Sequence, residues 1–245
     1  MKGVILAGGT GSRMLPLTRV SNKHLLPVYD RPMIFYPIET LVRTGITDIM
    51  IVTGGNSAGE FLRLLGNGKE FGLKDIFYTY QEGDLGIADA LKLAEHFSEG
   101  QRIVVILGDN ILEKDITPYV RAFEKQPSGA RLLLKEVPDP QRFGVPVMQD
   151  GRIVRIEEKP ARPQSAYAVT GVYMYDQRVF DFCRGLTPSA RGELEITDVN
   201  NAYIKQGDLA FDVLDGWWTD AGTFESYFLA NKLVAERRGW RPPGA

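Results

Sequence analysis

A cluster of glycines near the start of the chain is the first feature whose residue types indicate chemistry. The apolar run 4–7 is followed at once by the segment Gly-Gly-Thr-Gly-Ser-Arg, residues 8–13. Glycine lets backbone N–H groups come close to an anion, and Arg13 adds a permanent positive charge with a forked geometry that suits phosphate. This segment therefore predicts a strand that leads into a phosphate-binding loop.

The loop matches neither of the two commonest phosphate-binding patterns. The chain contains no Gly-Lys-Ser or Gly-Lys-Thr, and in the dinucleotide pattern GxGxxG the third glycine is replaced by Met14. The alternative is a tight glycine turn that binds nothing. Lys23 favours the phosphate interpretation, because Arg13 and Lys23 flank a segment, residues 14–18, that Pro16 prevents from being helical throughout. A long, irregular, basic loop suits a polyphosphate, whereas simple turns are short.

The elements that must position this loop follow from the hydrophobic pattern. Apolar runs that read as buried strands alternate with stretches of helical periodicity. The predicted strands are 4–7, 49–53, 76–80 and 103–107, and the predicted helices are 33–44, 57–65 and 87–97. This alternation predicts βαβ units and a doubly wound, Rossmann-like parallel sheet, whose ligands bind at the carboxyl ends of the strands. Asp109 follows the strand 103–107 directly, so it is a candidate metal ligand at that edge.

The second half of the chain has a different pattern of apolar runs. Strand-like runs at 130–137, 145–149, 153–157 and 168–175, with Asp150-Gly151 as a hairpin turn, predict a mixed sheet. The remaining predicted elements are a helix at 195–206, a strand at 209–214 and a helix at 223–238. We therefore expect one α/β domain, 1–245, made of a first half (about 1–125), a second half (about 126–222), a C-terminal helix and a tail at 239–245.

Composition excludes several other classes of protein. The chain has 245 residues, 44% of them hydrophobic, and a net charge of −2, so it has no general attraction for nucleic acid or anionic membranes. The single cysteine, Cys183, excludes an internal disulfide and reads as a small core residue of an amphipathic helix. The first residues run straight into a strand and no long apolar span follows, which predicts a cytoplasmic protein.

Several motifs, in order along the chain, resemble the sugar-nucleotide pyrophosphorylases. The closest likeness is to glucose-1-phosphate thymidylyltransferases, in a short form that ends soon after the core. The motifs are LAGGTGSRMLPLT at 6–18, NKHLLPV at 22–28, VILGDN at 105–110, RFGV at 142–145, EEKP at 157–160, YAVTG at 167–171, RGELEITD at 191–198 and WWTDAGT at 217–223. The resemblance covers residues 1 to about 230. It implies that the first half of the domain is the nucleotide half and the second the sugar half, whose mixed sheet is an inserted sugar-binding layer.

The resemblance implies a Mg²⁺-dependent enzyme that joins dTTP and α-D-glucose 1-phosphate to give dTDP-glucose and pyrophosphate, for deoxysugar and polysaccharide biosynthesis. Arg13, Lys23 and Asp109 are implied as catalytic residues, and Asp109 and Asp220 as metal ligands. From its position alone, Asp220 reads as a helix N-cap. The residues implied at the nucleotide are Leu6, Ala7, Gly8, Gly9, Thr10, Gly11, Ser12, Arg13, Lys23, Gln81, Gly86 and Asp109. The residues implied at the sugar phosphate are Asn110, Gly144, Glu158, Lys159, Val169, Tyr173 and Arg191.

Base recognition and substrate choice leave alternatives open. Gln81 follows the strand 76–80, where its amide matches the donor–acceptor edge of a pyrimidine, and Gly86 lets the base pack against the backbone. Long-form relatives carry a proline-containing segment after this glutamine, whereas residues 82–86 here contain none. A methyl group is worth only about 1–3 kcal/mol in a pocket, so a UTP- or other NTP-dependent enzyme is one alternative. An inactive nucleotide-sugar-binding regulator is another, and a homo-oligomer is compatible with either.

Overall fold

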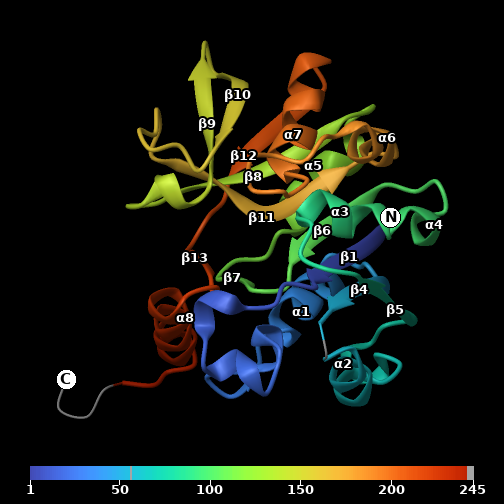
Figure 1. Ribbon diagram of the computed structural model, residues 1–245, viewed down its shortest axis with the longest axis vertical. Helices are drawn as coiled ribbons and strands as arrows, with labels where there is room; N and C mark the ends of the chain where they lie inside the picture. The colour runs from blue at the N-terminus through green and yellow to red at the C-terminus, as the bar shows by residue number, and fades with distance from the viewer. Residues whose placement is uncertain (56, 242–245) are drawn as a thin grey trace.

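A mixed, mostly parallel sheet of seven strands runs through the computed structural model, which describes residues 1–55 and 57–241 (Figure 1). Its strand order is β12 (Leu209–Val213), β8 (Ala130–Glu136), β11 (Tyr167–Tyr175), β6 (Ile103–Leu107), β1 (Lys2–Ala7), β4 (Asp48–Gly54) and β5 (Asp75–Gln81). β11 pairs antiparallel with both of its neighbours, and the other four pairings are parallel. The predicted fold class is confirmed.

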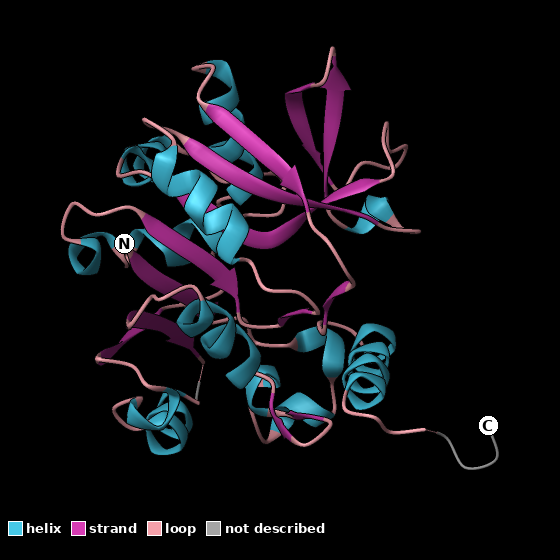
Figure 2. Ribbon diagram, turned by 180° about the vertical axis from the view of Figure 1, so that it is seen from behind, coloured by secondary structure: helices cyan, strands magenta, loops and turns pink. Residues whose placement is uncertain are grey.

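Helices cover both faces of this sheet, as βαβ crossovers require (Figure 2). The side chains of β1 alternate between the two faces: Val4 and Leu6 enter one apolar core, and Ile5 and Ala7 enter the other. The first core is closed by α3 (Ile87–Lys92), α4 (Glu95–Ser98), α6 (Arg178–Gly185) and α7 (Ile196–Lys205). The second is closed by α1 (Phe35–Arg43), α2 (Ala58–Leu65) and α5 (Thr117–Lys125). Cys183 is buried in the first core, as predicted.

The strands of the second half extend the same sheet rather than forming a layer of their own. β8, β11 and β12 continue it beyond β6, whereas β9 (Gly144–Gln149) and β10 (Arg152–Glu158) form a separate two-stranded hairpin. Asp150 and Gly151 both have positive φ, 49° and 72°, as the predicted tight hairpin turn requires. The hairpin projects away from the sheet at the top of Figure 1 and is tied to α7, because the Asn201 side chain bonds both backbone groups of Ile156.

Two small strands that the hydrophobic pattern does not reveal join distant parts of the chain. β7 (Asn110–Leu112) pairs antiparallel with β13 (Trp218–Asp220), and this pairing sets Asp220 opposite Asn110. The last helix, α8 (Phe224–Arg237), starts just after β13 and is capped by Thr223 through a reciprocal bond with Ser226. A second short pair, β2 (Pro27–Val28) with β3 (Arg31–Pro32), packs against α8.

Two expectations need adjustment. The predicted helix 87–97 is two helices, because Leu93 and Ala94 donate to residues three positions back and this tighter turn ends α3 before α4 begins. Of the predicted tail, residues 242–245 lie outside the described part of the chain. In that described part, no helix combines the length and the apolar character that crossing a membrane requires.

Gly54, at the end of β4, sets how closely the glycine loop packs on the sheet. A Cβ at this position would lie 2.5 Å from the carbonyl oxygen of Gly8, whereas a Cβ on Gly59 in α2 would meet no atom within 4 Å. Gly54→Ala should therefore lower the free energy of unfolding by about 1–3 kcal/mol, the usual range for overpacking. Gly59→Ala should leave it unchanged or raise it slightly. Urea denaturation of both variants tests this, and equal midpoints would contradict the close packing at Gly54.

Candidate active site

The glycine loop borders a cavity of about 400 Å³ at the carboxyl ends of β1, β5 and β6. The chain continues from the loop through three short 3₁₀ turns, Ser12–Met14, Leu17–Arg19 and Lys23–Leu25, so the segment is irregular as predicted. Gly11 has a φ of 68°, a left-handed conformation that favours glycine. The cavity is lined by Leu6, Gly8, Gly9, Thr10, Gly11, Ser12, Arg13, Lys23, His24, Gln81, Asp84, Gly86, Ile87, Ala90, Leu107, Asp109, Lys159, Arg191, Glu193 and Gly222.

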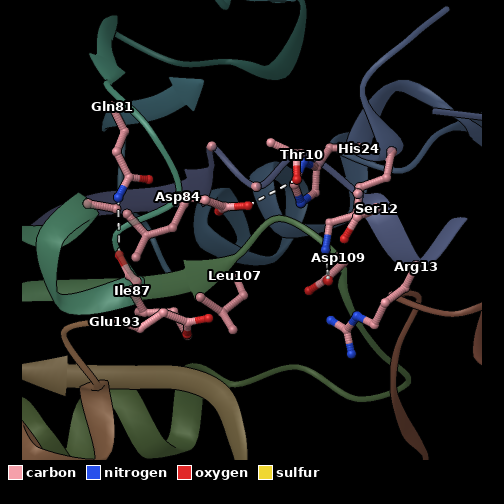
Figure 3. A pocket seen from close by; sticks show the side chains of 18 of the residues that line it. Thr10, Ser12, Arg13, His24, Gln81, Asp84, Ile87, Leu107, Asp109 and Glu193 are labelled. Carbon is pink, nitrogen blue, oxygen red and sulfur yellow. Dashed lines mark hydrogen bonds and ion pairs between the residues drawn. The ribbon is translucent and has the colours of Figure 1, made fainter. Parts of the chain in front are cut away.

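The segment between β5 and α3 forms the far wall of this cavity. Asp84 reaches across to the glycine loop and accepts a hydrogen bond from the Thr10 hydroxyl at 3.0 Å (Figure 3). Gly86 has a φ of 99°, and a Cβ there would lie 2.5 Å from the carbonyl oxygen of Leu194. A side chain is therefore excluded both by the backbone conformation and by the lack of room. The wall that faces the glycine loop is therefore backbone at Gly86 and an amide at Gln81.

Lys23 and Asp109 form a buried ion pair at the floor of the cavity. The Lys23 Nζ lies 2.5 Å from Asp109 Oδ2, and each side chain is only 10% exposed. Burial alone would raise the pKa of Asp109, but the charges of Lys23 and His24 and hydrogen bonds from Lys23 and Asn110 hold it well below its usual range. Burial and the positive charge of Lys23 lower the pKa of His24 to about 3, so this histidine is neutral at physiological pH.

Asp220 lies beside Asp109 because β13 pairs with β7, and the Ala221 N–H donates to the Asp109 carbonyl at 2.8 Å. Burial and the negative charge of Asp109 raise the pKa of Asp220 to about 6. Arg142 opposes this shift, since its guanidinium donates to both oxygens of Asp220 at 3.3 Å. A second buried carboxylate, which Arg142 contacts, thus lies next to the Lys23–Asp109 pair.

These two carboxylates fit a divalent cation. A Cβ on Gly222 would lie 3.2 Å from Asp109 Oδ2 and 3.5 Å from both Asp220 Oδ2 and a guanidinium nitrogen of Arg13, so the two carboxylate oxygens border one small space beside Gly222. Among the described residues, no group of three His, Cys, Asp or Glu side chains is placed to hold a metal alone. Mg²⁺ typically takes one or two carboxylates and completes its shell with water and substrate phosphate oxygens, which matches this donor set.

A second cavity, of about 150 Å³, adjoins the first and is bordered by β11, the β9–β10 hairpin and the β7–β13 pair. Its lining includes Arg13, Asp109, Asn110, Phe143, Gly144, Glu158, Lys159, Val169, Gly171, Tyr173, Arg191, Glu193, Glu195, Thr197, Asn200, Trp218 and Asp220. Asn110 is fixed on three sides. Its Oδ1 accepts from the Gly171 N–H and the Trp218 Nε1, and its Nδ2 donates to Asp109 at 3.0 Å. The register shift in β11 between Val169 and Tyr173 releases the Gly171 N–H for this contact.

The charged groups of the second cavity are held by one another. Arg191 contacts both oxygens of Glu195 at 2.8 Å and lies 3.4 Å from both Glu158 and Glu193. Glu158 also accepts from the Thr197 hydroxyl at 2.6 Å. Lys159 has a φ of 44°, which is rare for a residue with a side chain, and its N–H donates to the Phe143 carbonyl at 3.0 Å. Such a backbone conformation is costly and is found most often at functional sites.

The structure brings together almost all the residues singled out in the sequence. Every residue expected at the nucleotide lines the first cavity except Ala7, which is fully buried behind it and accepts a hydrogen bond from Asn22. Every residue expected at the sugar phosphate lines the second cavity, as does Asp220. Sequence reasoning missed Arg142, Glu195 and Trp218 as parts of the site. Arg142 lies in the RFGV motif and Trp218 in WWTDAGT. The motifs therefore indicated that these residues belong to the site, whereas their residue types alone did not.

A glycine loop at the carboxyl edge of a mostly parallel sheet, next to a second cavity lined by charged groups, is the arrangement typical of nucleotide-binding α/β proteins. A family profile described as nucleotidyl transferase matches residues 2–237, nearly the whole chain. The chain belongs to the nucleotidyl transferase family.

Individual relatives agree with this membership. The glucose-1-phosphate thymidylyltransferase of Neisseria meningitidis serogroup A is 44% identical over 96% of this chain and 82% of its own length. A Bacillus anthracis crystal structure in complex with sucrose, assigned to the same enzyme type, is 54% identical, with a TM-score of 0.92 over 96% of this chain and 95% of that one. A UDP-glucose pyrophosphorylase structure, 23% identical with a TM-score of 0.85 over 97% and 99% of the two chains, shares the fold.

The raised pKa of Asp220 predicts a gain in stability when its charge is removed. Above pH 6 the folded protein holds this carboxylate ionised at a cost, since ionisation is about two pH units easier when the chain is unfolded. In metal-free protein at pH 7.5, Asp220→Asn should therefore raise the free energy of unfolding by up to about 3 kcal/mol. The gain should fall between pH 6 and 4 and vanish at lower pH, where the carboxyl is protonated in both states.

Thermal unfolding in EDTA between pH 4 and 8 measures this, with the exposed Asp75→Asn as the matched control. Asp75→Asn should leave the melting temperature unchanged at each pH. A loss of stability in Asp220→Asn at pH 7.5 would show that the Arg142–Asp220 pair outweighs burial and the repulsion from Asp109.

Proposed function

We propose that the protein transfers the thymidylyl group of dTTP to α-D-glucose 1-phosphate, giving dTDP-glucose and pyrophosphate. One observation carries this proposal: the two cavities share Arg13, Asp109, Lys159 and Arg191 and so meet at one charged point. The larger cavity has the glycine loop and an amide for a base, and the smaller has carboxylates and backbone groups for sugar hydroxyls. A nucleotide and a sugar phosphate placed in them would meet phosphate to phosphate.

The chemistry requires positioning and charge neutralisation more than covalent help from the protein. A phosphate oxygen of the sugar phosphate attacks the α-phosphorus, the new P–O bond forms, and the bond to the bridging oxygen breaks as pyrophosphate leaves. The glycine loop binds the triphosphate through its backbone N–H groups. Arg13 and Lys23 neutralise the charge that grows on the leaving pyrophosphate, which preorganised donors do without reorganisation.

Mg²⁺ fits beside these residues, where Asp109 and Asp220 would hold it. Bound there, it neutralises phosphate oxygens and orients the α-phosphate. Asn110 keeps the Asp109 carboxylate in place through its Nδ2, and Trp218 and Gly171 keep Asn110 in place. Arg142 holds Asp220 from the other side. These protein contacts hold both acceptor groups in place without a cation.

On the sugar side, Lys159 and Arg191 bind the phosphate of glucose 1-phosphate. The Glu158 carboxylate accepts hydrogen bonds from sugar hydroxyls. Backbone groups of Gly144 and Val169 form further hydrogen bonds with them, and the sugar ring lies against Tyr173. Arg191 is held by carboxylates in this structure, and the incoming phosphate competes with them for its guanidinium. The carboxylates also repel a second anion, so the cavity favours a neutral sugar ring attached to a single phosphate.

Two of the relatives named above support dTTP and glucose 1-phosphate as substrates, since the Neisseria protein and the Bacillus structure carry the name glucose-1-phosphate thymidylyltransferase and match nearly the whole chain. A panel of dTTP, UTP, CTP, ATP and GTP with glucose 1-phosphate, followed by pyrophosphate release in Mg²⁺, tests the assignment. The highest kcat/KM with dTTP, and loss of turnover in EDTA that Mg²⁺ restores, would support it. A preference for UTP would keep the reaction class and change the base. Absence of turnover with every nucleotide would overturn the proposal.

Arg13 and Lys159 should show opposite kinetic defects if the two halves of the site have these roles. Arg13→Ala removes a donor to the leaving group, so kcat should fall by about 10²–10³ while KM for glucose 1-phosphate changes little. Lys159→Ala keeps the same strained backbone but loses the phosphate contact, so KM for glucose 1-phosphate should rise most. Steady-state kinetics with each substrate varied, and the exposed Lys125→Ala as control, measures this split. The same defect in both variants would contradict it.

A further inference from the structure

The side chain of Gln81 is held in one orientation by two acceptors. It is buried at the end of β5, where its Nε2 donates to the Gly86 carbonyl and to Asp89 Oδ2, both at 3.1 Å. An amide nitrogen has two hydrogens, so both are used. Figure 3 shows the Gln81 nitrogen turned toward its hydrogen bond and the amide oxygen turned the other way. That oxygen lies 2.8 Å from where a Cβ on Gly8 would lie, on the side of the glycine loop.

Asp89 decides this orientation because an ionised carboxylate accepts hydrogen bonds and donates none. A flipped Gln81 would place its carbonyl oxygen against the carboxylate, oxygen to oxygen. Asp89 lies in the first turn of α3, its side chain is only 17% exposed, and its other oxygen is held by Lys92 at 2.9 Å. The carboxylate is therefore fixed in position, and it keeps the Gln81 amide from turning over.

The consequence is that the cavity presents an acceptor, and no donor, from Gln81. Oε1 accepts no hydrogen bond from the described residues. A base that places a ring N–H there is complementary, as the imide N3–H of thymine and uracil is. Cytosine places an unprotonated ring nitrogen at the same edge, so two acceptors would face each other. Leaving a polar group unpaired in a buried site discriminates strongly between ligands.

We propose that Asp89 is a positioning residue that fixes the amide orientation of Gln81 and so makes the site select a pyrimidine with a ring N–H over cytosine. This inference rests on the proposed function, because it assumes that the base of the nucleotide lies against Gln81. It goes beyond that function in assigning selection to a side chain that does not line the cavity itself. Gln81 contacts the base, and Asp89 determines which hydrogen-bonding group of Gln81 faces it.

The test compares dTTP with dCTP in Asp89→Leu, Asp89→Asn and a control. Asp89→Leu removes the acceptor, so the ratio of kcat/KM for dTTP to that for dCTP should fall by roughly tenfold or more. Asp89→Asn has nearly the same shape but can also donate, so it should lower the ratio by less. Lys92→Met removes the ion-pair partner on the same helix and leaves the acceptor toward Gln81, so its ratio should stay within about twofold of the wild-type value.

Binding of dTTP and dCTP to each protein by calorimetry, without sugar phosphate, gives a second readout that does not need turnover. Equal losses for both nucleotides in Asp89→Leu would assign Asp89 a purely structural role and overturn the inference. So would a ratio that no variant changes, or a wild-type protein that binds dCTP as well as dTTP. If the wild-type protein selects dTTP in binding but makes no dTDP-glucose, the proposed function fails while the assignment of Asp89 stands.

Discussion

Two carboxylates of like charge, Asp109 and Asp220, lie close together in a place with little access to water, and much of the surrounding structure keeps them there. Burial and mutual repulsion raise the pKa of Asp220, while the charge of Lys23 and hydrogen bonds from Lys23 and Asn110 hold the pKa of Asp109 low. Lys23 comes from the irregular loop after β1, and Arg142, which holds Asp220, comes from the turn before β9. The site can therefore exist only if the first third, the middle and the end of the chain are folded together.

The short β7–β13 pair keeps Asp109 and Asp220 close to each other. Three residues from each strand pair antiparallel, and the buried Trp218 donates its indole N–H to Asn110, which in turn orients Asp109. Phe143 packs on Trp218 with ring centroids 5.2 Å apart, and the Arg142 guanidinium lies over the Phe143 ring. One small apolar cluster thus supports both carboxylates and Arg142, one of the cations that face them. Polar groups so fully paired are expected to be rigid.

How much of this the sequence predicts depends on the range of the interactions. The strands of the parallel core and the glycine loop follow from local apolar runs and glycine spacing, and their predicted bounds agree with the structure within two residues. β7 and β13 have only three residues each, too few for a periodic signal, and exist because they pair with each other. Glu195 reads as an acidic residue at a helix start, and it is indeed the N-cap of α7, yet it also binds Arg191. Arg191 is only four residues away, but the segment between α6 and α7 is a loop without regular periodicity, so the local pattern does not reveal this contact.

The continuity of the seven-stranded sheet has a consequence for how such a protein can change. β11 is bonded to β6 on one side and to β8 on the other, so the strands behind the two cavities form one hydrogen-bonded unit without a hinge. The distance between the glycine loop and Val169 is then fixed by the ladder itself. The β9–β10 hairpin, which carries Gly144 and Glu158, is outside this ladder and packs against α7 and β11. For protein engineering the hairpin is thus the exchangeable module, since its length and sequence can be altered without breaking a strand pairing of the sheet. Arg142 and Phe143, just before it, must stay because they support Asp220 and Trp218.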